Sequence, residues 1–322
     1  MSIEFVKSII AADMQAVDHI IRERLHSEVI LVRQVAEYIV SSGGKRLRPA
    51  LTLLSAGALG YRGRHHQELA AVVEFIHTAT LLHDDVVDES SLRRGRDTAN
   101  ALFGNAASVL VGDFLYSRAF QMMVDVNDMR IMQVVADATN VIAEGEVLQL
   151  MNIGDAELDE NAYLKVIRYK TAKLFEAAAR LGALLTASDQ ATETALASYG
   201  MHLGTAFQIV DDVLDYSGDA GEIGKSLGDD LAEGKCTLPL IHAMQLGTAE
   251  QAEVVRQAIV HAQRENFQAV LAAVQASGAL AATMAVARTE AQLATDAIAA
   301  LPDNPHSQAL RALAVFAVER HS

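Results

Sequence analysis

The chain has 322 residues and a formal net charge of −15, because 41 Asp and Glu outnumber 26 Lys and Arg. This length can bury a sizeable core, and the acidic balance argues against a nucleic-acid partner, whose phosphates need a basic surface. The single cysteine, Cys236, excludes an internal disulfide. The sequence shows neither a secretory signal nor a good candidate for a membrane span, so we expect a cytoplasmic protein.

Helix-forming residues dominate the composition. Ala, Leu, Met, Gln and Glu are plentiful, aromatic residues make up only 5%, and no proline lies between Pro49 and Pro239. Apolar residues recur at three- and four-residue spacing, which is typical of amphipathic helices. With no linker, low-complexity tract or strict repeat in view, we predict an all-α fold in which residues 1–322 form one large helical bundle.

The expected elements follow one another with short breaks. A helical region over 3–40 should end at Gly43-Gly44, and the next helix has Pro49 in its first turn. Residues 93–96 are expected in a loop, and the Gly- and Asp-rich stretch 217–236 is expected to be irregular. The other expected helices span residues 67–89, 106–125, 129–151, 159–187, 191–216, 237–247, 249–264, 266–276, 279–299 and 305–320.

Two acidic motifs carry the strongest chemical signal. Asp84, Asp85 and Asp88 end one apolar helix with the spacing D-D-x-x-D, and Asp211, Asp212 and Asp215 repeat it at the end of another. Carboxylates on one helical turn repel each other, and divalent cations would remove that cost. One such motif fits a solvated helix end equally well. Two copies favour a cluster of Mg²⁺ ions held between carboxylates and phosphates.

Basic residues cluster beside these acids. Lys45, Arg46 and Arg48 follow two glycines, and Arg93, Arg94 and Arg96 follow the first acidic motif. Arginine offers a fork of donors to phosphate oxygens and lysine offers a point charge. The pattern indicates a polyanion bound by metals and side chains together, with ordinary surface ion pairs as the alternative.

Taken together, the motifs resemble those of the trans-isoprenyl diphosphate synthases, in particular the long-chain bacterial members of the octaprenyl diphosphate synthase kind. The resemblance covers about residues 40 to 240, in the same order. It implies an isoprenoid-synthase-like bundle around a central cavity and a homodimer. It also implies condensation of isopentenyl diphosphate with an allylic primer such as farnesyl diphosphate, for a quinone side chain. The motifs that carry it are G-G-K-R-x-R-P (43–49), D-D-x-x-D-x-x-x-x-R-R-G (84–95), G-D (112–113), K-T (170–171), F-Q-x-x-D-D-x-x-D (207–215) and G-K (234–235).

The resemblance also assigns roles to individual residues. The diphosphate of isopentenyl diphosphate would be bound by Lys45, Arg48, His77 and Arg94. The allylic diphosphate would be contacted by Arg93, Lys170, Thr171, Gln208, Lys225 and Lys235. Mg²⁺, about two or three ions per site, would be held by Asp84, Asp88 and Asp211, with Asp212 and Asp215 as neighbours or water-mediated ligands and Asp85 in support. Phe207 and Gln208 would line the place where the two substrates meet.

Product length would depend on small residues ahead of the first acidic motif. By resemblance to short-chain relatives, bulky residues at the positions of Ala79 and Thr80 would block the product tunnel, and both residues here are small. The floor must then lie deeper. Phe120 and Met123, with Val124 roughly on the same helix face, are our candidates, and ordinary core packing is the alternative.

Two other functions are weaker. A terpene cyclase also uses Asp-rich helices, but it has no second substrate for Lys45 and Arg48 to hold. A non-catalytic partner subunit that sets product length would have lost the acidic motifs, and this chain keeps both. The product is apolar, so contact with a membrane surface during its release would be peripheral.

Overall fold

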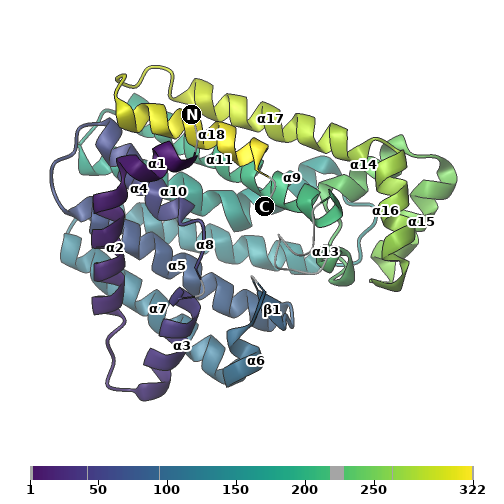
Figure 1. The fold of residues 1–322 in the computed structure, drawn as a ribbon, viewed down its shortest axis with the longest axis horizontal. Coiled ribbons are helices and arrows are strands. Elements are labelled where there is room, and N and C mark those ends of the chain that lie inside the picture. Colours follow the sequence, from purple (N-terminus) through teal and green to yellow (C-terminus); the bar gives the residue numbers. More distant parts are fainter. Residues whose placement is uncertain (1–2, 42, 94, 218–227, 263, 321–322) are drawn as a thin grey trace. The chain divides into compact units, whose positions relative to one another are not determined.

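The computed structural model describes residues 3–41, 43–93, 95–217, 228–262 and 264–320. Helices make up most of this part of the chain (Figure 1). Its strands are β1 (Leu92–Arg93) and β2 (Arg96–Asp97), a small antiparallel hairpin in which Leu92 pairs with Asp97 and Arg93 with Arg96. The predicted all-α fold is confirmed, although a short hairpin lies where a loop was expected.

Contacts divide the chain into two compact units. Unit 1 comprises Met1–Thr139, Leu174–Gly200 and Ala297–Leu313, and unit 2 comprises Asn140–Lys173, Met201–Asp296 and Ala314–Ser322. The helices are α1 (Ile3–Ile9), α2 (Ala11–Arg24), α3 (Ile30–Ser41), α4 (Leu47–Ala58), α5 (His65–Val87), α6 (Ala99–Phe103), α7 (Asn105–Val126), α8 (Met129–Met151), α9 (Glu160–Ile167), α10 (Lys173–Leu185), α11 (Gln190–Ser217), α13 (Asp229–Ala232), α14 (Leu238–Leu246), α15 (Ala249–Val260), α16 (Phe267–Ala276), α17 (Ala279–Ala297) and α18 (Pro305–Glu319).

Two expected helices are interrupted. The region 3–40 forms α1, α2 and α3, with a break after Leu25 where the Ser27 hydroxyl accepts a hydrogen bond from the Val29 N–H. Such a local bond offers the backbone an alternative to the helical ladder. The region 159–187 forms α9 and α10 with one π-helical turn, Arg168–Ala172, between them. Periodicity predicts the helices here but has no signal for a turn of this kind.

The core of unit 1 is built around α5. This helix packs against α2, α4 and α7, and its face toward them is apolar and fully buried, including Phe75, Ile76 and Leu82. Helix α10 approaches α4 closely because Gly182 has no side chain. A Cβ there would lie 2.5 Å from Cβ of Ser55 and 2.6 Å from the backbone nitrogen of Ala56. The first acidic motif therefore ends a helix that is held on several sides.

Unit 2 has its own apolar core. Residues of α9, α11, α14, α15, α16 and α17 contribute to it, among them Ile209, Leu240 and Val270. Helix α14 packs against α15 and α16, and α15 packs against α16. The buried positions of α11 lead directly into the second acidic motif.

Among the described helices, none alone is long and apolar enough to cross a membrane. Helices α16 and α17, which are bent by 69° at their junction, meet the length and hydropathy required of a span only as a pair.

Candidate active site

The first acidic motif lies at the C-terminal end of α5. Asp84 and Asp85 belong to the last turn, and Asp88 is the C-cap, whose N–H donates to the Asp84 carbonyl at 2.8 Å. The C-terminus of a helix carries a partial negative charge, so acids there are unfavourable without a cation. This position strengthens the sequence argument for a cation-binding site.

Asp85 is fully buried and paired with Arg93. The Nε and Nη2 atoms of Arg93 donate to Asp85 Oδ1 at 2.8 and 2.6 Å. The second oxygen of Asp85, Oδ2, is buried without a hydrogen-bond partner among the described residues. The resemblance places Arg93 on the allylic diphosphate, and in this structure it pairs with Asp85 of the acidic motif.

Two residues expected to bind isopentenyl diphosphate meet in unit 1. Nη1 of Arg48 lies 3.1 Å from Nε2 of His77, and the Arg48 guanidinium stacks on the Phe175 ring with 4.5 Å between its carbon and the ring centroid. The stacking fixes the plane of the guanidinium. Lys45, the third predicted residue, is exposed just before α4. Arg46 has a different role, because its Nη1 pairs with Glu74 at 2.9 Å.

The π-turn in unit 2 presents Lys170 and Thr171. Nζ of Lys170 lies 2.6 Å from Oε2 of Glu146, and the Thr171 hydroxyl donates to Oε1 of Gln208 at 3.0 Å. Helix α8 can approach the turn because Gly145 leaves room, since a Cβ there would lie 2.6 Å from the Lys170 nitrogen. π-Turns inside helices are rare and concentrate at functional sites.

A chain of hydrogen bonds continues into the second acidic motif. The Gln208 amide donates to Asp212 Oδ1 at 2.8 Å, and the Tyr163 hydroxyl donates to Asp212 Oδ2 at 2.6 Å. The structure therefore brings Thr171, Gln208 and Asp212 together, as expected of residues that serve one site. Tyr163 was not predicted, because no spacing rule connects α9 with α11.

The carboxylates of this motif are crowded. Burial raises the pKa of both Asp212 and Asp215, and the nearby charge of Asp230 raises it further. Asp215 Oδ1 accepts a hydrogen bond from the Gly228 N–H at 3.0 Å, but its Oδ2 is buried without a partner among the described residues. Asp230, on α13, extends the acidic cluster beyond the predicted motif.

Asp211 has a partner that the sequence did not indicate. Nη2 of Arg320, near the end of the chain, lies 2.7 Å from Asp211 Oδ1 and donates to the Phe207 carbonyl at 2.7 Å. The Arg320 guanidinium also stacks on the Phe207 ring, with 3.9 Å between its carbon and the ring centroid, and its side chain is only 2% exposed. Phe207 and Asp211 are thus joined by one buried arginine.

The acidic residues fit a divalent cation only together with further ligands. Within the described residues, no three His, Cys, Asp or Glu side chains are arranged to hold a metal ion by themselves. The unpartnered oxygens of Asp85 and Asp215 nevertheless provide the hard donors that Mg²⁺ prefers. Mg²⁺ commonly takes one or two carboxylates and completes its shell with substrate phosphates and water.

Of the remaining residues predicted to bind diphosphate, the structure describes only Lys235. Lys235 is paired with Glu233 in unit 2. Arg94 and Lys225 lie outside the residues that the structure describes, so their predicted roles have no structural account.

The residues predicted to set product length lie on α5 and α7, which pack against each other. Ala79 and Met123 are completely covered, whereas Thr80 and Phe120 keep some exposed surface. Val124 does not share the face of Met123, since it is 63% exposed. Its side chain follows Met123 by about 100° around the helix, which here turns it into solvent.

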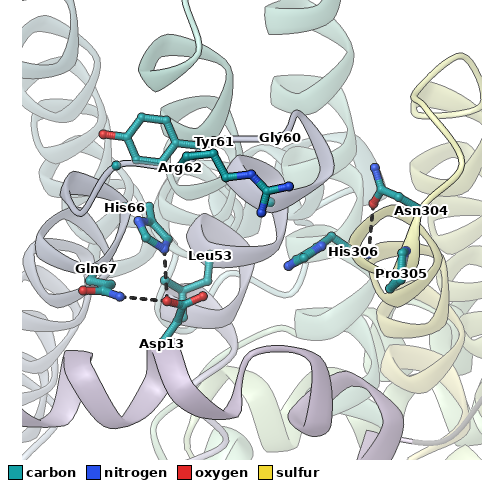
Figure 2. Close-up of a pocket in the computed structure, with 12 residues that line it drawn as sticks. Asp13, Leu53, Gly60, Tyr61, Arg62, His66, Gln67, Asn304, Pro305 and His306 are labelled. Atoms are coloured by element: carbon teal, nitrogen blue, oxygen red, sulfur yellow. Dashed lines mark hydrogen bonds and ion pairs between the residues drawn. The ribbon is translucent and has the colours of Figure 1, made fainter.

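A separate pocket of about 480 Å³ lies in unit 1 (Figure 2). In it, Asp13 Oδ1 accepts a hydrogen bond from Gln67 at 2.7 Å and lies 3.2 Å from Nε2 of His66. None of the residues predicted for the active site lines this pocket, and we do not assign the reaction to it.

The raised pKa of Asp215 predicts a pH-dependent cost in the metal-free protein. A carboxyl whose pKa is higher in the folded state contributes stability below its unfolded pKa and loses it as the pH rises through the folded value. The unfolding midpoint of Asp215→Asn, relative to that of the unmodified protein, should therefore rise between about pH 5 and about pH 9, measured with a chelator present.

Asp189→Asn is the control for this experiment. Asp189 is fully exposed, and hydrogen bonds from Thr192 lower the pKa of its carboxyl, so it stays ionised over the whole interval. Its substitution should change stability equally at both pH values. An Asp215→Asn effect that is also independent of pH would contradict the prediction.

Comparisons with known proteins agree with this geometry. The polyprenyl synthetase family model matches residues 29–276. The chain is 53% identical to octaprenyl diphosphate synthase of Escherichia coli and 45% identical to an all-trans-nonaprenyl-diphosphate synthase of Rhodobacter capsulatus, with 99% of each chain covered in both cases. A polyprenyl synthase from Caulobacter crescentus, solved with calcium and isoprenyl diphosphate, superposes with a TM-score of 0.97 and 46% identity, covering 100% of this chain and 98% of that one.

These matches confirm the resemblance that the motifs carried, and they place the chain among the prenyltransferases. The identity extends well beyond the motifs, over nearly the full length of each relative. The chain belongs to the polyprenyl synthetase family.

Proposed function

We propose that this chain is a long-chain all-trans-polyprenyl diphosphate synthase that makes about eight isoprene units and supplies a quinone side chain. Two acidic helix ends, each with a buried carboxylate oxygen that lacks a donor, carry the proposal. The family membership and the relatives named for octaprenyl and nonaprenyl products support the long chain.

The residues suit an ionisation mechanism. The C–O bond of the allylic diphosphate breaks, and the double bond of isopentenyl diphosphate attacks the allylic cation to form a new C–C bond. A proton is then lost from the adjacent carbon to the departing pyrophosphate. When bound, Mg²⁺ would neutralise charge that develops on the leaving group.

The chain's own residues would hold the two diphosphates. Lys170 and Thr171 on the π-turn, with Gln208, would orient the allylic diphosphate, and Arg48 with His77 would hold that of isopentenyl diphosphate. Such preorganised donors act on charge where it develops, in a site from which water is excluded. Asp84, Asp88 and Asp211 would be the metal ligands, with about two or three ions per site.

A product assay tests this proposal. Purified protein with farnesyl diphosphate, labelled isopentenyl diphosphate and Mg²⁺ should give an all-trans product of about eight units, because Ala79 and Thr80 leave room for a long chain. Asp84→Ala should lose most activity, since it removes a proposed metal ligand. A folded protein that yields no condensation with Mg²⁺ present would reject the proposal.

Met123→Ala should lengthen the product. The side chain of Met123 is buried on α7, and its truncation would open space at the proposed floor of the product tunnel. The variant should also lose about 2–5 kcal/mol of unfolding free energy, as is usual for buried Met to Ala. Chromatography of the products measures the length. An unchanged distribution in Met123→Ala, with longer products from Phe120→Ala, would move the floor to Phe120.

We also propose a cytoplasmic homodimer that uses α7. Leu110 and Val124 on this helix are 66% and 63% exposed, and burial of such apolar side chains against a second copy would stabilise a dimer. Leu110→Glu should shift sedimentation toward the monomer, with Ser117→Glu on the same helix as a control for added charge. Sedimentation of the unmodified protein as a monomer would contradict the dimer.

Any membrane contact during product release would be peripheral.

A further inference from the structure

A buried carboxylate on α17 connects two segments of the proposed active site. Glu290 is 6% exposed and has partners on both of its oxygens. Oε1 accepts a hydrogen bond from Nη2 of Arg168 at 2.9 Å, and Oε2 lies 2.6 Å from Nδ1 of His202. Glu290 therefore links α17 to the π-turn and to α11, and all three contacting residues belong to unit 2.

The carboxylate is ionised in this setting. Burial alone would raise the pKa of Glu290, but hydrogen bonds and positive charge from His202 and Arg168 lower it below its usual value. Removing one member of a buried ion pair leaves the other charge uncompensated. The contact is therefore sensitive to loss of the Glu290 charge.

The two partners stand close in sequence to residues that would bind diphosphate. Arg168 is the first residue of the π-turn, two positions before Lys170. His202 lies six positions before Gln208 on α11, and Gln208 accepts the hydrogen bond from Thr171. Glu290 thus contacts the same two segments that the Thr171–Gln208 hydrogen bond joins.

We propose that Glu290 is a positioning residue for the allylic diphosphate, acting through Arg168 and His202 on the π-turn and α11. The proposal rests on the proposed function, since it takes Lys170, Thr171 and Gln208 as diphosphate-binding residues. Glu290 itself would not touch the substrate. Its loss would leave the Thr171–Gln208 hydrogen bond without this second link between the turn and α11, and misplacement of binding groups by a fraction of an ångström weakens binding.

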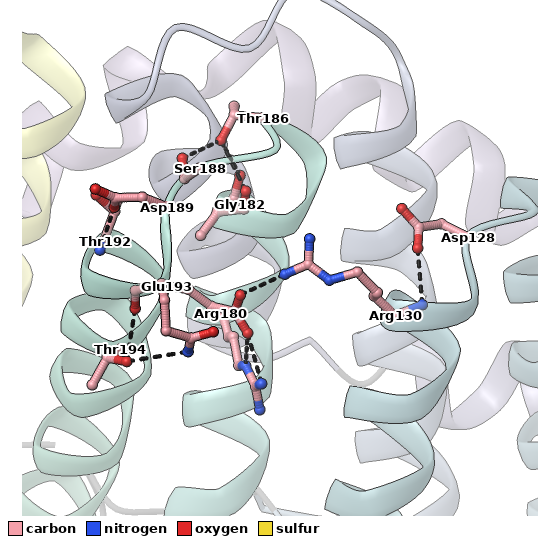
Figure 3. A network of polar contacts seen from close by, with 12 residues as sticks. Asp128, Arg130, Arg180, Gly182, Thr186, Ser188, Asp189, Thr192, Glu193 and Thr194 are labelled. Carbon is pink, nitrogen blue, oxygen red and sulfur yellow. Dashed lines mark hydrogen bonds and ion pairs between the residues drawn. The ribbon is translucent and has the colours of Figure 1, made fainter.

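Glu193 provides a matched comparison in unit 1. It is also a buried glutamate, and its Oε1 accepts a hydrogen bond from Nε of Arg180 at 2.6 Å while Oε2 accepts one from Nη2 of Arg130 at 2.6 Å (Figure 3). Figure 3 shows this network at the start of α11, and none of the residues labelled there is predicted to bind substrate. Glu193→Gln therefore reports the general cost of neutralising a buried, doubly paired glutamate.

The experiment compares Glu290→Gln with Glu193→Gln in the full-length protein. We expect Glu290→Gln to raise KM for farnesyl diphosphate by about tenfold, while KM for isopentenyl diphosphate stays within about twofold. Glu193→Gln should lower the unfolding midpoint and leave both KM values unchanged. Titration calorimetry with inorganic pyrophosphate and Mg²⁺ should show weaker binding only for Glu290→Gln.

The outcomes separate this proposal from the proposed function. If the unmodified protein fails to condense the substrates, the proposed function fails, and the pyrophosphate titration still tests the positioning role. The positioning role would be overturned if Glu290→Gln changed KM for both substrates equally. It would also be overturned if Glu193→Gln raised KM for farnesyl diphosphate as much as Glu290→Gln does. If Glu290→Gln does not fold, Arg168→Lys takes its place, because lysine keeps the positive charge but lacks the forked guanidinium. Its KM for farnesyl diphosphate and its affinity for pyrophosphate then test the positioning role in the same way.

Discussion

The structure depends on carboxylates placed where helices least tolerate them. Asp84, Asp85 and Asp88 end α5, and Asp215 lies in the last turn of α11, with Asp211 and Asp212 in the turn before it. The helix dipole and mutual repulsion both oppose negative charge there. Natural sequences accept such a cost at functional sites, where a bound ligand offsets it. The surrounding packing of α5 and α11 holds these ends in place despite that cost.

Each acidic motif has one arginine that neutralises it in part. Arg93 holds Asp85 of the first motif, and Arg320 holds Asp211 of the second. In each motif one buried carboxylate oxygen, Asp85 Oδ2 or Asp215 Oδ2, still has no hydrogen-bond donor among the described residues. Such an oxygen suits a divalent cation that also binds phosphate oxygens. The arginines therefore stabilise the metal-free protein without taking up every carboxylate oxygen.

The sequence predicted those parts of the fold and site that depend on local pattern. Helix periodicity and the acidic spacing lie within one element, and both motifs end helices as expected. The contacts of Tyr163, Glu290 and Arg320 join elements far apart in the chain, so the spacing of residues within one element could not predict them. The π-turn at Arg168 adds one residue to a helical turn without a change in composition. The face predicted for Val124 was wrong because adjacent residues lie about 100° apart around a helix, which exposes Val124 while Met123 is buried.

The division into two units separates two properties of the proposed reaction. Ala79, Thr80 and Met123, which would set product length, belong to unit 1 and act by volume alone. Lys170, Gln208 and Glu290, which would set allylic diphosphate binding, belong to unit 2 and act by charge and hydrogen bonding. Apolar volume and polar geometry respond to different substitutions. Substitutions at the apolar positions of unit 1 could therefore change product length without altering the ion pair of Lys170 with Glu146 or the hydrogen bond of Thr171 with Gln208 in unit 2.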